Sequence, residues 1–159
     1  MPRAKKPPLS FVEQMKKLIA SGINDSPKIA VKDDCDALTP LEERVQNILG
    51  LSDNTRKRKD RMLFFVMYDI ESDKVRRLVV KYLIREGCTR IQKSIFLADR
   101  PVETYNKIKS DLAEVQAVYD NEDSIIVLPV TTDYLRMMKV IGKNIDVDII
   151  THSKNTLFF

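Results

Sequence analysis

Residues 62–90 carry the side chains of this chain that are best suited to chemistry. The apolar segment MLFFVMYDI (62–70) contains a single carboxylate, Asp69, close to its end. An amphipathic segment follows at once and places Arg76 and Arg77 within its opening turns. A carboxylate at a strand end suits a hard cation such as Mg²⁺, and the planar guanidinium group of arginine suits phosphate. This pairing points to nucleic acid as the ligand.

Each of these side chains also has a purely structural interpretation. Asp69 could help to cap a helix that begins at Ser72 or Asp73, and Asp73 suits the positive end of that helix dipole. Glu71 and Asp73 are alternatively acids just outside a metal site. Arg76 and Arg77 lie off the apolar stripe of the helix, where arginines are commonly only solvated.

Five segments indicate how these residues are positioned. Residues 62–70 form a nearly continuous apolar run, which is typical of a central strand buried on both faces. In chain order there follow a helix closed at Gly87, strand material over 89–98 that can fold as a hairpin near Lys93 and Ser94, a long helix after Pro101, and a strand over 124–130. The order βαββαβ predicts an α+β, ferredoxin-like fold with both helices on one face of an antiparallel sheet.

The ends of the chain lie outside this pattern. Residues 1–60 are expected to form a helical, basic N-terminal extension, with helix starts at Ser10 and Thr39, and 61–142 the main domain. The two short helices must pack on the main domain or on a partner, yet removal of 1–60 is expected to leave a folded dimer. Residues 143–159 contain apolar strand material, which we expect to pair with a second subunit or a partner protein.

A run of four cations precedes the first strand of the main domain. It is either a solvated linker or an arm that contacts phosphate, and its members are Arg56, Lys57, Arg58 and Lys59. The net charge of +4 is modest, and residues 61–159 hold 15 Lys+Arg against 14 Asp+Glu. A phosphate-binding surface in the main domain must therefore come from local clustering of cations.

Composition excludes several classes of protein. With 43% hydrophobic residues over 159 positions the chain can form a core, and it has no run of 18 apolar residues. Cys35 and Cys88 lie apart without a CxxC spacing, and His152 is the only histidine, which argues against a zinc site or a catalytic triad. The basic N-terminus lacks a following apolar segment, so a secretory signal is not expected. We expect a soluble intracellular protein with free thiols and no membrane partner.

In this arrangement residues 62 to about 142 resemble the Cas-two family of CRISPR-associated proteins. The matching pieces, in order, are Tyr68-Asp69-Ile70, Asp73-Lys74-Val75-Arg76-Arg77, the stretch from Gly87 to Phe96, Ile126-Val127-Leu128-Pro129-Val130, and Val140-Ile141-Gly142. Each piece alone is unspecific, whereas the set in this order and at these spacings is specific. The extension of about 60 residues departs from the usual short member of the family.

The resemblance implies a function in CRISPR defence. It implies a homodimer with swapped C-terminal strands, in the prokaryotic cytoplasm, that bridges two Cas-one integrase dimers and binds duplex DNA during spacer acquisition. It also implies a Mg²⁺-dependent endonuclease acting on single-stranded RNA or DNA, in which the two copies of Asp69 face each other across the two-fold axis and share one ion as the catalytic metal site.

Phosphate contacts follow from the same resemblance. The resemblance favours Arg76 and Arg90, beside Arg77, as ligands of phosphate. It also favours Ser94 as a hydrogen-bond donor to phosphate. Phe96 is expected to serve core or dimer packing rather than base stacking. Arg90 is expected to lie close to Asp69 if the strands that carry them are neighbours.

Three classes of function compete. The first is an adaptation subunit that binds DNA, and the second is a stand-alone metal-dependent endoribonuclease of the Cas-two type or of the similar VapD toxin type. A small-ligand regulatory domain is the third, but it would use a Gly-rich turn, and the chain has only 4 Gly. The first two classes differ in whether Asp69 is needed for activity.

Overall fold

The computed structural model describes most of the main domain and part of the extension. The described residues are 8–22, 38, 40, 43–44, 60–118, 122–142 and 145–148. Several predictions lie outside them: most of the helix expected after Thr39, the basic run 56–59, Cys35, His152 and the tail from residue 149 onward.

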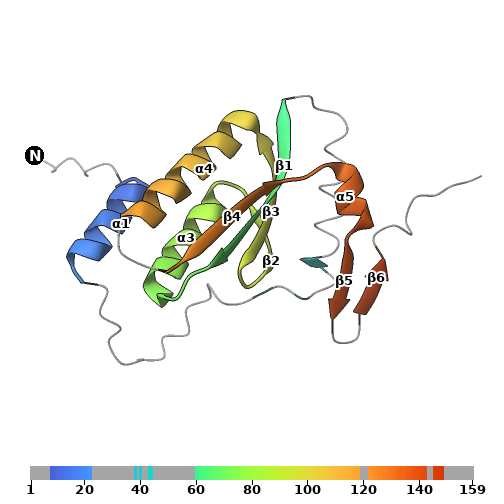
Figure 1. The fold of residues 1–159 in the computed structure, drawn as a ribbon, viewed down its shortest axis with the longest axis horizontal. Helices are drawn as coiled ribbons and strands as arrows, with labels where there is room; N and C mark the ends of the chain where they lie inside the picture. Colours follow the sequence, from blue (N-terminus) through green and yellow to red (C-terminus); the bar gives the residue numbers. More distant parts are fainter. Residues whose placement is uncertain are drawn as a thin grey trace, which may run out of the picture.

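The order of elements in the main domain is βαββαβ (Figure 1). The elements are α1 (Phe11–Ala20), β1 (Arg61–Asp69), α3 (Asp73–Arg85), β2 (Thr89–Gln92), β3 (Ile95–Pro101), α4 (Val102–Ala117), β4 (Ser124–Pro129), α5 (Thr132–Met137), β5 (Lys139–Gly142) and β6 (Ile145–Asp148). The predicted α+β, ferredoxin-like fold is confirmed. The hairpin predicted near Lys93 and Ser94 is also present, because β2 and β3 are joined through these two residues.

A four-stranded antiparallel sheet has the order β2-β3-β1-β4, with β1 in its interior. β4 is an edge strand that ends at Pro129, as expected for a residue without a backbone N–H. The register pairs Asp69 with Ser124 and Met67 with Ile95. The end of β1 therefore lies beside the start of β4 and the turn between β2 and β3.

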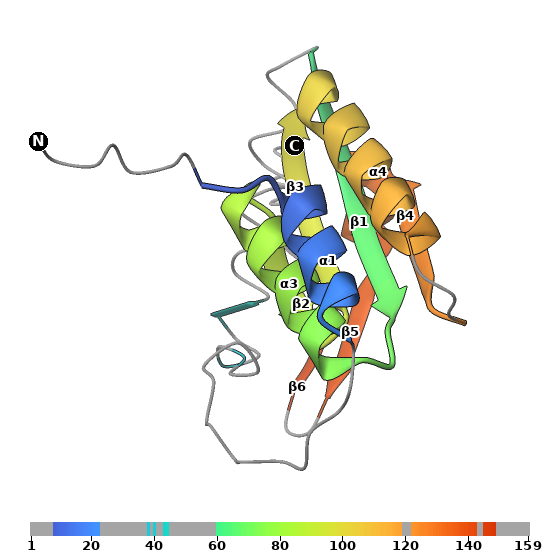
Figure 2. The same ribbon diagram turned by 90° about the vertical axis from the view of Figure 1, so that its left-hand side faces the viewer.

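The helices α3 and α4 cover one face of this sheet, and α1 packs against both of them (Figure 2). Alternate residues of β1 face them, and Phe64 and Val66 are fully buried there. The stripe of α3 reaches the same core through Val75, Val79 and Leu83. This side of the sheet forms the larger of the two apolar clusters, which we call the helix-side core.

Helix α1 belongs to this core although it comes from the predicted extension. Its start is fixed by a capping box in which Ser10 and Glu13 exchange hydrogen bonds of 2.8 and 3.2 Å. Phe11 stacks on Tyr82 with ring centroids 4.0 Å apart, and Met15 is 0% exposed. Of the two alternatives for this helix, packing on the main domain therefore holds. The expectation that a chain without residues 1–60 still folds does not follow from this packing.

The opposite face of the sheet is only partly covered. Leu135 of α5 packs on Leu63, Ile91 and Leu97 and closes one end of this face. Elsewhere it stays open: Ile126 is 56% and Leu128 is 46% exposed. We call the four residues Phe65, Met67, Ile126 and Leu128, which form two cross-strand pairs, the open sheet face.

The C-terminal segment pairs within the chain. Strand β6 forms an antiparallel two-stranded sheet with β5, from Lys139 opposite Asp148 to Gly142 opposite Ile145. Residues 143–159 are expected from the sequence to pair with a second subunit or a partner protein, whereas residues 145–148 pair with 139–142 of the same chain. Pairing of this hairpin with a second subunit stays a prediction. Among the described residues, no helix is both long and apolar enough to cross a membrane.

Candidate functional site

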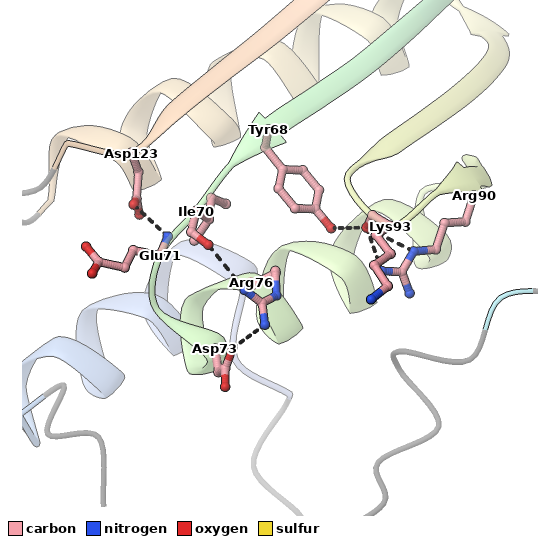
Figure 3. A network of polar contacts seen from close by, with 8 residues as sticks. All are labelled: Tyr68, Ile70, Glu71, Asp73, Arg76, Arg90, Lys93 and Asp123. Carbon is pink, nitrogen blue, oxygen red and sulfur yellow. Dashed lines mark hydrogen bonds and ion pairs between the residues drawn. The ribbon is translucent and has the colours of Figure 1, made fainter.

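Four segments meet at one end of the sheet, and we call this region the β1 end. They are the end of β1, the start of α3, the turn between β2 and β3, and the start of β4. Figure 3 shows the polar contacts that join them. Four of the site residues predicted from the sequence lie here: Asp69, Arg76, Arg90 and Ser94.

Asp69 is the last residue of β1 and is exposed. Within the described part of the chain its side chain makes no hydrogen bond or ion pair. The N-cap position of α3 is Ser72, whose side chain makes no capping bond. Because the Asp69 side chain makes no hydrogen bond within the described residues either, it does not cap this helix. Its carboxylate is consequently available to a ligand.

Arg76 is held against the loop that follows β1. Its guanidinium group forms an ion pair with Asp73, one turn earlier in α3, and Nη1 donates to the carbonyl oxygen of Ile70 at 3.4 Å (Figure 3). The side chain remains partly exposed. The sequence therefore places Arg76 where the helix brings it back to the strand end, because residues three apart share a helix face.

Arg90 reaches the β1 end from the other side. Its Nε and Nη2 atoms donate to the carbonyl oxygen of Lys93 at 3.2 and 2.6 Å, and its Cζ lies 5.8 Å from the centroid of the Phe96 ring. The same carbonyl accepts the Tyr68 hydroxyl at 3.1 Å (Figure 3). Thus the turn and the end of β1 are tied together around one oxygen atom.

Arg90 would lie close to Asp69 if β2 and β1 were neighbouring strands, but the sheet does not have this order. β3 lies between β2 and β1, and Arg90 is opposite Phe96, which is opposite Val66. Arg90 therefore starts in the Val66 row, three residues before Asp69. It comes near the β1 end because its side chain extends along the strand toward Lys93.

The other predicted residues divide between this site and elsewhere. Ser94 is half-buried in the turn, and its carbonyl oxygen accepts the Tyr68 backbone N–H at 3.1 Å. Phe96 is fully buried in the helix-side core, so it packs within its own chain. Arg77 faces a groove between α1 and α3. The run 56–59 lies outside the described residues.

A contact that the sequence did not indicate joins β4 to the site. Asp123 accepts the backbone N–H of Glu71 through Oδ1 at 3.0 Å (Figure 3). This bond connects the loop after β1 to the residue just before β4. The only signal in the sequence is an acid immediately before the strand, which is too common to identify such a contact.

The comparison with known families gives the identity of this domain. Residues 62–138 match the family model described as CRISPR associated protein Cas2. This domain belongs to the Cas2 family. A search with the full sequence finds no significant match among curated proteins. The resemblance stated from the sequence is therefore confirmed, together with a CRISPR-associated role.

The match separates the Cas2 domain from the parts that surround it. It begins at the second residue of β1 and ends after α5, so the whole β1 end lies inside it. Helix α1 and the β5–β6 hairpin lie outside the matched span, although α1 completes the core. Any surface that needs α1 therefore goes beyond the matched part of the chain.

A metal would find few ligands in one copy of this Cas2 domain. Among the described residues no group of three or more His, Cys, Asp or Glu side chains could hold a metal ion. Mg²⁺ usually binds one or two carboxylates and several waters, and Asp69 can supply one such ligand.

Cys88 has no place in the chemistry of the site. It is buried next to Gly87, and this burial raises the pKa of its thiol to about 12, although the nearby positive charge of Arg100 acts in the opposite direction. The thiolate is the nucleophilic form of cysteine, and almost none is present near neutral pH. Cys88 is therefore a core residue.

Proposed function

We propose that this protein is a subunit of the CRISPR adaptation machinery that dimerises, holds duplex DNA through phosphate contacts and bridges two Cas-one integrase dimers. Membership of the Cas2 family supports the CRISPR context. The observation that carries the DNA contact is the placement of Arg76 and Arg90 on either side of the end of β1. Both guanidinium groups are oriented by backbone carbonyl oxygens, so less freedom is lost when phosphate binds.

Such contacts do not depend on base sequence. Each phosphate neutralised by Arg or Lys releases counterions, so the binding constant falls with salt along a slope of about −0.9 per contact for duplex DNA. A protein that holds fragments of any sequence for integration would use this mode of binding. Duplexes of equal length and unrelated sequence should bind with equal affinity.

We expect Arg90→Glu to weaken duplex binding and to lower the salt slope by about one for each phosphate that the protein no longer neutralises. The matched control is Arg85→Glu, because Arg85 lies in the last turn of α3 with its guanidinium over the Tyr82 ring, away from the β1 end. Fluorescence anisotropy of a labelled duplex at several salt concentrations measures both quantities. An equal loss of affinity in the two variants would contradict a specific contact at the β1 end.

Dimerisation is supported by the open sheet face. Exposed apolar residues on an edge strand beside a half-buried Phe65 and Met67 are typical of an interface. A second copy placed against this face would bury Ile126 and Leu128. It would also bring a second set of strand ends close to the first.

We expect Ile126→Glu to convert the protein to a monomer. Two buried isoleucines contribute about 3 kcal/mol or more to a symmetric interface, so their loss weakens the dimer by at least about a hundred-fold. The control is Ile84→Glu, since Ile84 is 54% exposed on α3, away from the sheet. Analytical ultracentrifugation gives the dissociation constants, and a dimer that survives Ile126→Glu would place the interface elsewhere.

A second candidate function is metal-dependent cleavage of nucleic acid, either within the adaptation subunit or as a stand-alone endoribonuclease. The exposed Asp69 carboxylate, unengaged within the described residues, favours it. Two copies of Asp69 would hold one Mg²⁺, which supplies an activated water and neutralises charge on the phosphodiester. Arg76 and Arg90 would then hold the phosphates that flank the bond to be cut.

A further inference from the structure

A groove between α1 and α3 lies outside the site described above. It has a volume of about 420 Å³ and runs along the outer surface of the two helices. Its lining residues are Gln14, Lys17, Leu18, Ser21, Lys74, Arg77, Leu78 and Lys81. Figure 2 shows the two helices that form its walls.

The two walls have the same residue spacing. Each helix presents positions i, i+3, i+4 and i+7, from Gln14 to Ser21 on α1 and from Lys74 to Lys81 on α3. Residues at this spacing occupy one face of a helix, so a single face of each helix lines the groove. Leu18 and Leu78 are half-buried against the helix-side core and form its floor.

The rim of the groove is positively charged. Four of the lining residues are cations, and none of the residues that line the groove is acidic. Of the acids on the same helices, Asp73 pairs with Arg76, while Glu13 accepts the Ser10 N–H and also interacts electrostatically with Lys17. Two of these lysines, Lys17 on α1 and Lys81 on α3, have exposed side chains. Such convergence of like charges raises the local potential and attracts an anionic partner.

We propose that this basic groove binds the phosphodiester backbone of the nucleic acid held at the β1 end, and this inference rests on the proposed function. Lys74 lies in the first turn of α3, beside Asp73 and Arg76, so the groove begins where the site ends. From Lys74 to Lys81 the helix rises about 10 Å, which exceeds the separation of two successive phosphates of one strand. This continuity favours a nucleic-acid strand over an acidic peptide as the occupant.

The extension would thus have a function of its own. Helix α1 lies outside the span that matches Cas2, yet it supplies Lys17 and one wall of the groove. A Cas2 domain without α1 would retain the cations of α3 on an open helix surface. With α1 in place, the strand is contacted from two sides and its path is directed along the helices.

Adjacent lysines on α1 provide a matched test. Lys17 lines the groove, whereas Lys16 points to α4 and pairs with Glu114 at 3.0 Å. Lys17→Glu and Lys16→Glu change the net charge equally and at neighbouring positions. The full-length variants are titrated with a fluorescein-labelled duplex of arbitrary sequence, with single-stranded RNA, and with a polyglutamate peptide, each from low to moderate salt. Lys17→Gln is included, and circular dichroism checks that every variant is folded.

Lys17→Glu should weaken nucleic-acid binding about eight-fold at about 0.1 M salt, which corresponds to the removal of one phosphate contact, and Lys16→Glu should have little effect. Lys17→Gln should show the same reduced salt slope. If the wild type binds nucleic acid and Lys17→Glu binds it as Lys16→Glu does, the proposal that the groove binds phosphate is overturned, while the proposed function stands. If the wild type binds no nucleic acid, both fail. Binding of polyglutamate alone, abolished in Lys17→Glu, overturns the proposal in favour of an acidic protein partner.

Discussion

Asp69→Asn is expected to abolish Mg²⁺-dependent cleavage while duplex DNA binding stays intact. The substitution keeps the size of the side chain and removes the negative charge that holds the ion. A metal that activates water and stabilises phosphodiester charge contributes several kcal/mol to the transition state, so the rate should fall on the order of a thousand-fold. Binding should be unchanged or slightly stronger, because a negative charge near the phosphates is removed.

The measurement compares labelled single-stranded RNA and duplex DNA, with and without Mg²⁺. Asp123→Asn is the matched control, since Asp123 lies at the same end of the sheet but accepts the Glu71 N–H, a bond that an asparagine oxygen can also accept. Cleavage that needs both Mg²⁺ and Asp69 identifies a nuclease with Asp69 as the metal ligand. Salt-sensitive duplex binding without any cleavage, unchanged in Asp69→Asn, identifies a scaffold in which Asp69 has no catalytic function.

Local patterns were sufficient to predict most of this fold. Gly87 has φ +85°, a left-handed conformation that ends α3, and a Cβ there would lie 3.0 Å from the Arg100 guanidinium. The turn at Lys93 and Ser94 and the edge position of Pro129 follow equally from short-range rules. These features depend on neighbours in sequence, and therefore a single sequence reveals them.

Long-range placement was harder to predict. The alternation of residues 89–98 indicates strands but not their neighbours, so the sequence did not reveal that β3 separates Arg90 from β1. The bond between Asp123 and Glu71 joins residues 52 apart and has no local signal. The candidate site was predicted by residue type at Asp69, Arg76 and Arg90, whereas the way in which Lys93 and Ile70 orient the arginines required coordinates.

The N-terminal extension shows the same limit most clearly. The stripe Phe11, Met15, Leu18 and Ile19 predicts an amphipathic helix, but it does not say which surface that helix covers. Tyr82 on α3 is buried, and the stacked ring of Phe11 contributes to this burial. The boundary drawn at residue 60 by composition therefore does not coincide with the boundary of the core.

Met15→Ala should destabilise the whole domain and not only its N-terminus. Met15 is 0% exposed and packs in the same cluster as the sheet residues Phe64 and Val66. Truncation of a fully buried methionine costs about 2–5 kcal/mol through lost transfer energy and the cavity that remains. In a chain of this size each kcal/mol lowers the melting temperature by about 2–4 °C. Thermal unfolding followed by circular dichroism should therefore show a decrease on the order of 10 °C.

Met137→Ala is the control, because Met137 at the end of α5 is 67% exposed and should leave the melting temperature nearly unchanged. Removal of residues 1–22 should have a larger effect than Met15→Ala, since it uncovers the Tyr82 ring and the surface between α3 and α4. Such a truncated protein should aggregate or lose cooperative unfolding. If Met15→Ala and Met137→Ala melt alike and the truncated chain remains folded, then α1 does not contribute to the core. The basic groove would then lose its second wall as well, because the same packing of α1 on α3 forms both.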